Sequence, residues 1–356
     1  MGAKIKVFLG GFINYTNAQN LNCLALANNL DKEKFSVYTL EINSGNLESQ
    51  QGKIKGVHIF NCIKPTRISI YIGFLWGIWN CDVAYLPKTE LWKFNRFILN
   101  IFGKKSFSTA EGILDKENLK STIKAIGNMQ NIIDFYSYTD KKFPITKFVG
   151  SYNQKKHQIK TEDTVLYLGC DREFFKNDML KDGILSKVAY IGRLKKRKGV
   201  YDFLNLAKVF PEIDFLLFGE GEEKKSIEMF CMQNNIQNYK LIGVVSHSEL
   251  KKYLEEVDLH ILPSRSEGFP KVTLETAAAG VPSIVYSDYG ASEWIMNAKN
   301  GWVVNTLQEM IGVISSLKQN PQELATISKN TKELAKEFDW KVRVKDWEEV
   351  IIRLSN

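Results

Sequence analysis

The sequence predicts an α/β protein of two doubly wound domains, each a mostly parallel sheet covered by helices. Short apolar runs alternate with longer amphipathic stretches through both halves of the chain, which is the pattern of parallel strands joined by helices. A length of 356 residues is enough for about two domains, each with its own core. The composition is 44% hydrophobic and 25% charged, which is ordinary for a soluble or peripheral protein.

In the first half, the predicted strands are KIKVFLGG, FSVYTL, DVAYLP and KKSFSTAEG, and the stretch from Gln19 to Leu30 has helical spacing. The second half repeats the design with KVAYIGR, IDFLLFGEG, KLIGVV, VDLHILPS and VPSIVYSD as strands. Amphipathic stretches at 199–209 and 222–234 separate the first three of these. The order of elements therefore predicts the same doubly wound architecture twice.

No linker rich in glycine and serine separates the halves, so we place the boundary where the second series of strands begins. We expect an N-terminal domain over residues 1–180, a C-terminal domain over 181–339, and a final helix over 340–356 that packs on the N-terminal domain. Ligands of open parallel sheets bind at the carboxyl ends of the strands. We therefore expect the functional site in a cleft between the two domains.

The cysteines and the N-terminus favour a cytoplasmic protein. An odd number of cysteines without a CxxC pair argues against a disulfide framework: Cys23, Cys62, Cys81, Cys170 and Cys231. The first residues hold only a short apolar run before a double glycine, and we expect no export signal there.

The net charge of +8 lies in the first half of the chain. Residues 1–170 hold 22 Lys and Arg against 13 Asp and Glu, a net charge of +9, whereas residues 171–356 hold 26 against 27, a net charge of −1. A basic half attracts phosphates, nucleic acid or an anionic membrane, but solvated surface lysines give the same count. Both interpretations stay open on the charge alone.

The segment SRSEGFPKVTLETAAAGVPSIVYSD, residues 264–288, is the most specific in the chain. Pro270 suits the first turn of a helix and Gly280 its exit, so we expect a helix from Pro270 to Ala279. Glu267 precedes this helix and Glu275 lies on it, and both are able to face one ligand. The backbone N–H groups of residues 268–271 would be available to a phosphate or a sugar. The alternative is that both glutamates are solvated surface charges.

A second motif, GRLKKRKG at residues 192–199, directly follows a predicted strand. It brings Arg193 and Lys198 to the carboxyl edge of the same sheet. Taken alone, such a basic loop is usually only solvated.

Together the two motifs resemble the retaining nucleotide-sugar glycosyltransferases of family 4, the glycosyl transferases group 1, which have the GT-B fold. The resemblance rests on Gly-Arg, four residues and Lys-Gly after a strand, and then on Glu-Gly-Phe with a second glutamate further on. It covers residues 187–340, including the Phe218-Gly219-x-Gly221 turn. The first half matches only loosely, through Gly10-Gly11 and Leu168-Gly169-Cys170-Asp171.

The resemblance implies a role for each motif residue. Arg193 and Lys198 would hold the donor diphosphate and stabilise the departing nucleotide, and Glu275 would take the ribose hydroxyls. Glu267 would grip the donor sugar together with the backbone of Gly268, Phe269, Pro270 and Lys271. Gly192 and Gly11 would belong to the same donor site, and Val245, after the strand end at Gly243, would lie beside the base. The implied catalytic residues are Glu267, Arg193 and Lys198.

One site residue departs from the family. Where members often carry a histidine near the donor sugar, this chain has Thr109-Ala110-Glu111-Gly112. Glu111 is thus a candidate for the acceptor side, and a purely structural carboxylate is the open alternative.

The implied donor is a UDP- or GDP-linked sugar, and the implied acceptor is a glycan, lipid-linked in bacterial cell-surface polysaccharide synthesis (lipopolysaccharide, O-antigen or capsule). We expect no cofactor, metal or nucleic acid, since the four histidines lack ligand spacing and no Asp-x-Asp occurs. A non-catalytic partner subunit with the same fold is the alternative function.

The acceptor side of the chain also suggests contact with a membrane. The stretch Glu90 to Lys105 is a broad apolar helix with basic residues along one stripe, and it suits either an anionic membrane or a sheet-covering core position. The uncharged run Ile68 to Trp79 is too short to span a bilayer, and we expect it in the core.

Overall fold

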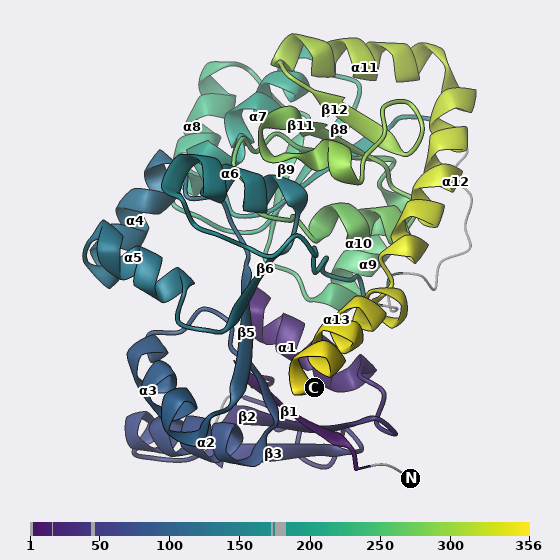
Figure 1. Ribbon diagram of the computed structural model, residues 1–356. Coiled ribbons are helices and arrows are strands. Elements are labelled where there is room, and N and C mark those ends of the chain that lie inside the picture. The colour runs from purple at the N-terminus through teal and green to yellow at the C-terminus, as the bar shows by residue number, and fades with distance from the viewer. Residues whose placement is uncertain (1–2, 16, 44–46, 172–173, 175–182) are drawn as a thin grey trace. The chain divides into compact units, whose positions relative to one another are not determined.

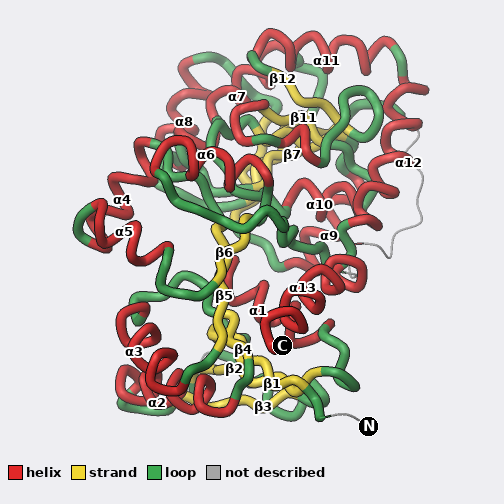
Figure 2. The backbone as a smooth tube through the Cα atoms, viewed as in Figure 1, coloured by secondary structure: helices red, strands yellow, loops and turns green. Residues whose placement is uncertain are grey.

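The computed structural model describes residues 3–15, 17–43, 47–171, 174 and 183–356, and its chain divides into two compact units. The first unit is Met1–Leu168 with Trp340–Asn356, and the second is Gly169–Asp339. The boundary that the sequence placed near residue 180 falls outside the described residues. Figure 1 labels the elements of both units, and Figure 2 separates their yellow strands from the red helices.

In the described part of the first unit, six parallel strands form one sheet in the order β3-β2-β1-β4-β5-β6. The strands are β1 (Ile5–Phe12), β2 (Phe35–Ile42), β3 (Val57–Cys62), β4 (Val83–Tyr85), β5 (Lys105–Ala110) and β6 (Lys141–Pro144). Side chains alternate between the two faces of such a sheet. Tyr85 and Phe107 therefore share one face, and Ser108 shares the opposite face with Lys142, its partner in register.

Helices cover both faces of this sheet. They are α1 (Ala18–Asn29), α2 (Thr66–Asn80), α3 (Trp92–Phe102), α4 (Lys116–Ile126), α5 (Met129–Tyr136), α6 (Lys147–His157) and α13 (Trp340–Ser355). Trp347 of α13 packs its ring against Tyr85 and Phe107, and α2 brings Phe74 against Phe8. The chain therefore returns to its first unit through α13, after the second unit is complete.

The run Ile68 to Trp79 forms most of α2, and the expectation that it lies in the core is wrong for half of it. Its buried side includes Phe74 and Ile78, but Ile68, Ile72 and Trp79 are 60%, 50% and 61% exposed. An uncharged run has no polar side to show which face is solvated. Among the described residues, no helix is long and apolar enough to cross a bilayer.

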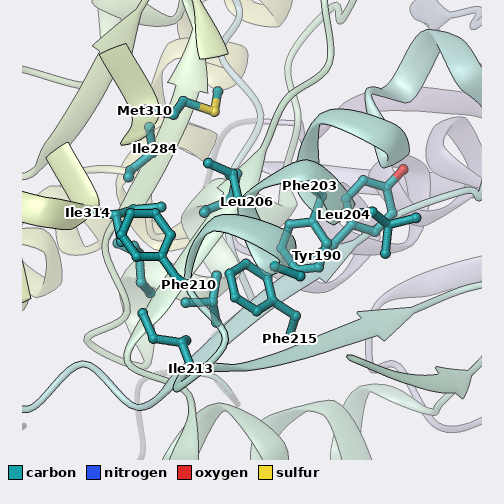
Figure 3. Packing of buried hydrophobic residues seen from close by; sticks show 14 of the residues in the cluster. Tyr190, Phe203, Leu204, Leu206, Phe210, Ile213, Phe215, Ile284, Met310 and Ile314 are labelled. Carbon is teal, nitrogen blue, oxygen red and sulfur yellow. The ribbon is translucent and has the colours of Figure 1, made fainter. Parts of the chain in front are cut away.

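The described part of the second unit has a six-stranded parallel sheet in the order β12-β11-β10-β7-β8-β9. Its strands are β7 (Lys187–Ile191), β8 (Asp214–Phe218), β9 (Tyr239–Gly243), β10 (Leu259–Leu262), β11 (Ser283–Tyr286) and β12 (Gly301–Val304). In the core, Tyr190 and Phe215 from the sheet pack against Phe203 of helix α7 (Val200–Val209) and Phe210 at the end of that helix, as Figure 3 shows. Central strands buried on both faces position the loops that follow them.

The helices of the second unit are α7 (Val200–Val209), α8 (Lys224–Gln233), α9 (His247–Glu256), α10 (Val272–Ala278), α11 (Leu307–Gln319) and α12 (Pro321–Glu337). A short 3-10 turn, η2 (Lys196–Lys198), leads into α7. The five cysteines of the chain are all buried and free, without a disulfide.

Three glycines hold the loops of the second unit against one another. A Cβ on Gly199 would lie 1.8 Å from the carbonyl oxygen of Pro263, and a Cβ on Gly219 would lie 2.1 Å from that of Gly192. A Cβ on Gly221 would lie 2.2 Å from the carbonyl oxygen of Leu194. Because real side chains never approach so closely, only glycine lets these backbones touch.

We expect Gly199→Ala to lower the free energy of unfolding by about 2–4 kcal/mol, since it adds a backbone clash to the strain of a left-handed residue. Gly199 has φ 74°. Gly243→Ala is the matched control, because Gly243 has φ 86° but open space around its Cβ position. Strain alone should then cost about 1 kcal/mol. Urea unfolding of both variants measures the difference, and equal losses would contradict the close packing at Gly199.

Candidate functional site

The candidate site lies at the carboxyl ends of β7 and β10 in the second unit. From β7 the chain adds β8 and β9 on one side, then crosses to add β10, β11 and β12 on the other. The strand order therefore reverses between β7 and β10. In open α/β sheets this reversal leaves a crevice at the carboxyl ends of the strands, where ligands bind.

The loop after β7 is fixed by its backbone. The N–H of Gly192 donates to the carbonyl of Phe218 at 3.0 Å, and the N–H of Leu194 donates to that of Glu220 at 3.0 Å. The hydroxyl of Tyr190 donates to the carbonyl of Arg193 at 2.7 Å. These bonds use only main-chain atoms of Arg193, so its exposed guanidinium projects from a held backbone and has no ion-pair partner among the described residues.

Lys198 and Glu267, the residues predicted from two separate motifs, meet in this structure. The Nζ atom of Lys198 donates to Oε1 of Glu267 at 2.5 Å, and their side chains are only 18% and 13% exposed. An ammonium group has three protons, so this ion pair uses one and leaves two directions for a further acceptor. The Lys198 ammonium is therefore a partly buried cation that Glu267 holds in place and that can still bind an anion.

Two tyrosines that the sequence did not single out flank Glu267. Burial raises the pKa of Tyr190 and of Tyr289, and the charge of Glu267 raises it further. Both phenols therefore stay neutral beside the carboxylate. Their signal in the sequence is weak, because Tyr190 alternates within a strand like any core residue, and Tyr289 is the first residue after the motif.

The loop after β10 brings Glu267 to the ion pair and leads into α10. Phe269 anchors this loop, packing against Trp294 at 4.8 Å and Phe338 at 5.7 Å between ring centroids. The helix begins at Val272 rather than at Pro270, because the carbonyl of Pro270 accepts from the N–H and the hydroxyl of Thr273 in a turn that precedes it. The residues predicted to offer backbone groups, 268–271, thus form a loop before the helix.

Glu275 lies in the first turn of α10, half-buried beside Cys170. Burial raises the pKa of the Cys170 thiol, and the charge of Glu275 raises it further. Val245 follows β9, two strands from β7, in the short loop before α9. The structure thus brings Lys198 and Glu267 into contact, while Glu275 on α10 and Val245 after β9 lie elsewhere in the same unit.

Gly11 and Glu111 belong to the first unit. Gly11 lies in β1, where a Cβ would come within 2.6 Å of the sulfur of Cys23 in α1, so packing within the unit already requires a glycine. Its predicted approach to a diphosphate stays a prediction. Glu111 follows β5 and accepts from the hydroxyls of Thr109 at 2.9 Å and Tyr85 at 3.3 Å.

Comparisons with known proteins point to one family of enzymes. Residues 171–334 match the family model of glycosyl transferases group 1. An uncharacterized glycosyltransferase of Methanocaldococcus jannaschii is 28% identical over 62% of this chain and 63% of its own length. The alpha-monoglucosyldiacylglycerol synthase of Acholeplasma laidlawii is 26% identical over 46% of this chain and 42% of its own length. The chain thus spans less than two thirds of either relative.

A solved structure extends the likeness in fold to nearly the whole chain. Anabaena Alr3699/HepE, crystallised in complex with UDP and glucose, matches with a TM-score of 0.79 and 16% identity over 98% of this chain and 100% of that one. The two parallel sheets have the GT-B fold, and the part of the chain that contains the Lys198–Glu267 pair is a glycosyl transferases group 1 domain.

Proposed function

We propose that this protein is a glycosyltransferase that moves a sugar from a UDP- or GDP-linked donor to a sugar acceptor, with retention of configuration and without a metal ion. The observation that carries the proposal is the ion pair of Lys198 and Glu267, where the strand order reverses in a glycosyl transferases group 1 domain. A neighbour in fold is described with UDP and glucose, which supports the donor class.

In this proposal, Lys198 and Arg193 hold the donor diphosphate. The two free protons of the Lys198 ammonium point to phosphate oxygens, while Glu267 fixes the ammonium in place. A unit charge about 4 Å from a phosphate is worth roughly 4 kcal/mol at an effective dielectric of about 20. Expressed fully in the transition state, that would be about three decades in rate. The cations thus stabilise the charge that develops on the leaving nucleoside diphosphate.

The remaining donor contacts follow from the two loops. Glu267 and the backbone of residues 268–271 grip the donor sugar, and Glu275 accepts from the ribose hydroxyls. The loop from Gly243 to Val245 takes the base. Gly192 and Gly11 keep their backbones close enough for the donor.

We further propose a lipid-linked glycan of bacterial cell-surface polysaccharide synthesis as the acceptor, met at the cytoplasmic face of the membrane. Helices α2 and α3 of the first unit contact one another and expose large apolar side chains, among them Trp79 at 61%, Phe97 at 62% and Ile101 at 58%. Exposed basic residues accompany them: Arg67, Lys93 and Arg96. Apolar side chains with basic neighbours are what an interfacial helix presents to an anionic leaflet. A relative named as a glycolipid synthase supports this acceptor class.

The decisive test of the function has two stages. A panel of nucleotides and nucleotide sugars is screened by thermal shift, where a donor raises the melting temperature by mass action. With that donor, release of free nucleoside diphosphate is then measured with and without membrane lipid extract. Release that depends on the extract supports a transferase, whereas binding without release under any condition supports the non-catalytic partner subunit. The anomeric configuration of the product tests retention.

We expect Lys198→Met to weaken binding of the donor nucleotide by about tenfold to a hundredfold, since a charge-assisted hydrogen bond contributes about 1.5–3 kcal/mol. Lys196→Met is the matched control, because Lys196 belongs to the same η2 turn but is exposed. Calorimetric titration with the nucleotide measures both variants. Unchanged affinity in Lys198→Met, or an equal loss in Lys196→Met, would remove Lys198 from the donor site.

We expect the protein to float with vesicles that contain phosphatidylglycerol and not with pure phosphatidylcholine, and to detach as salt screens the basic residues. Trp79→Ser with Phe97→Ser should reduce flotation at least tenfold, because each large apolar side chain contributes about 1.5–3 kcal/mol when buried.

Met232→Ser is the control for the flotation experiment, since Met232 is 77% exposed on the second unit. Equal flotation with neutral and anionic vesicles, or full binding of the double variant, would refute the membrane proposal.

A further inference from the structure

A cavity of about 220 Å³ lies in the first unit beside the carboxyl end of β5, and none of the donor-site residues named above lines it. Its wall combines Glu111 from the end of β5, Lys142 from β6, Tyr136 from α5, and Asn118 and Ser121 from α4. At about 30 Å³ per water in the liquid, this volume holds about seven waters, comparable to one small sugar ring. The wall offers hydroxyl and amide groups, an aromatic ring and charges of both signs.

Lys142 is the unusual member of this wall. The residue is 6% exposed, and its Nζ atom donates to the hydroxyl of Ser108 at 2.6 Å. The ring centroids of Phe135, Tyr136 and Tyr138 lie 5.7, 5.0 and 6.0 Å from Nζ. Among the described residues, no carboxylate lies within ion-pair distance of it. A buried ammonium without a paired anion is costly, and either the loss of its proton or the arrival of an anion relieves that cost.

The charged groups that face the cavity leave one excess positive charge. Lys142 and Lys88 line it, and Glu111 is the carboxylate on the same wall. One oxygen of Glu111 already accepts from Thr109 and Tyr85. The phenols of Tyr136 and Tyr138 stay neutral, because burial raises the pKa of both. When both lysines are protonated, a ligand with a single negative charge neutralises the wall. A phosphate dianion would instead leave one uncompensated negative charge beside Glu111.

We propose that this cavity binds a sugar unit of the acceptor that carries a carboxylate, and that Lys142 pairs with that carboxylate. The proposal rests on the proposed glycosyltransferase function, and it names an acidic sugar as the acceptor class. The hydroxyls of the sugar then meet Asn118 and Ser121, and its ring lies against Tyr136. Lys142 thus acts as a binding residue for the acceptor rather than as a group that touches the reacting atoms.

Carboxylate binding in this cavity is coupled to a proton. Burial lowers the pKa of Lys142 to about 7, against a smaller opposing effect of Glu111. A bound carboxylate favours the protonated form and raises that pKa. Below the pKa of the empty cavity the ammonium is already charged, and above it binding must take up a proton. Affinity for an acidic sugar therefore falls by about tenfold from about pH 6 to about pH 8, while a neutral sugar shows no such change.

The experiment titrates the intact chain, without nucleotide, with matched pairs of probes. The probes are the methyl glycosides of glucuronic and galacturonic acid against those of glucose and galactose, and glucose 6-phosphate as the phosphate. Ligand-observed NMR gives the affinities at about pH 6 and about pH 8. We expect at least one uronide to bind about tenfold or more tightly than its neutral partner at the lower pH. The reason is that only the uronide forms a charge-assisted hydrogen bond with Lys142.

The matched variants are Lys142→Met and Lys141→Met. Lys141 is the preceding residue of β6 on the other face of the sheet, where it pairs with Glu162. The carboxylate preference should vanish in Lys142→Met and persist in Lys141→Met. Thermal unfolding checks that both variants fold, and the pH dependence in the unmodified chain tests the idea without any variant.

Three outcomes would overturn the inference: equal affinity for acidic and neutral sugars, a preference that survives Lys142→Met, or tighter binding of glucose 6-phosphate than of either uronide. The absence of any measurable binding at high probe concentration would overturn the inference in the same way as equal affinity. Because no nucleotide is present, these outcomes are independent of the donor panel. Failure here with a functional donor site would leave a transferase with a neutral acceptor, and failure of the donor panel alone would leave an acidic-sugar-binding protein.

Discussion

The second unit of this molecule depends on backbones that touch. Gly199, Gly219 and Gly221 bring the loops after β7, β8 and β10 so close that a single methyl group would overlap a carbonyl oxygen. This contact fixes where the 3-10 turn ends, and hence where the Lys198 ammonium lies. Glu267 then has a cation at hydrogen-bond distance without help from a ligand. Preorganised charges of this kind act on a substrate without a cost for reorganisation at the moment of reaction.

The interior of both sheets could be predicted from the sequence, and some of their edges could not. Predicted runs such as KVAYIGR and IDFLLFGEG became β7 and β8, which lie inside the sheet and are apolar after their first residue. The strands without a prediction, β3, β6 and β12, all lie at sheet edges. The strands β6 and β12 have only four residues each, and β3 and β6 carry polar residues such as His58 and Lys141. Their pattern therefore does not stand out from that of a loop.

The same distinction explains what could be predicted of the sites. Lys198 and Glu267 belong to compact motifs that follow central strands, so their meeting follows from the order of the chain. Lys142 gave no such signal, because a lysine in a sequence is normally exposed and its burial depends on β5, β6 and α5 packing together. The exposed face of α2 could not be predicted for a different reason. Every residue of the run from Ile68 to Trp79 is uncharged, so only the fold decides which side is covered.

The return of α13 to the first unit has a consequence for synthesis of the chain. The second unit is one continuous segment, Gly169–Asp339, and is complete before Trp340 is translated. The first unit receives Trp347, which covers Tyr85 and Phe107, only after the whole second unit has been made. On the ribosome, the second unit therefore has all of its residues before the first unit does. Until Trp347 is made, the aromatic face of Tyr85 and Phe107 lacks the side chain that covers it. Chaperones bind transiently exposed apolar surface of this kind.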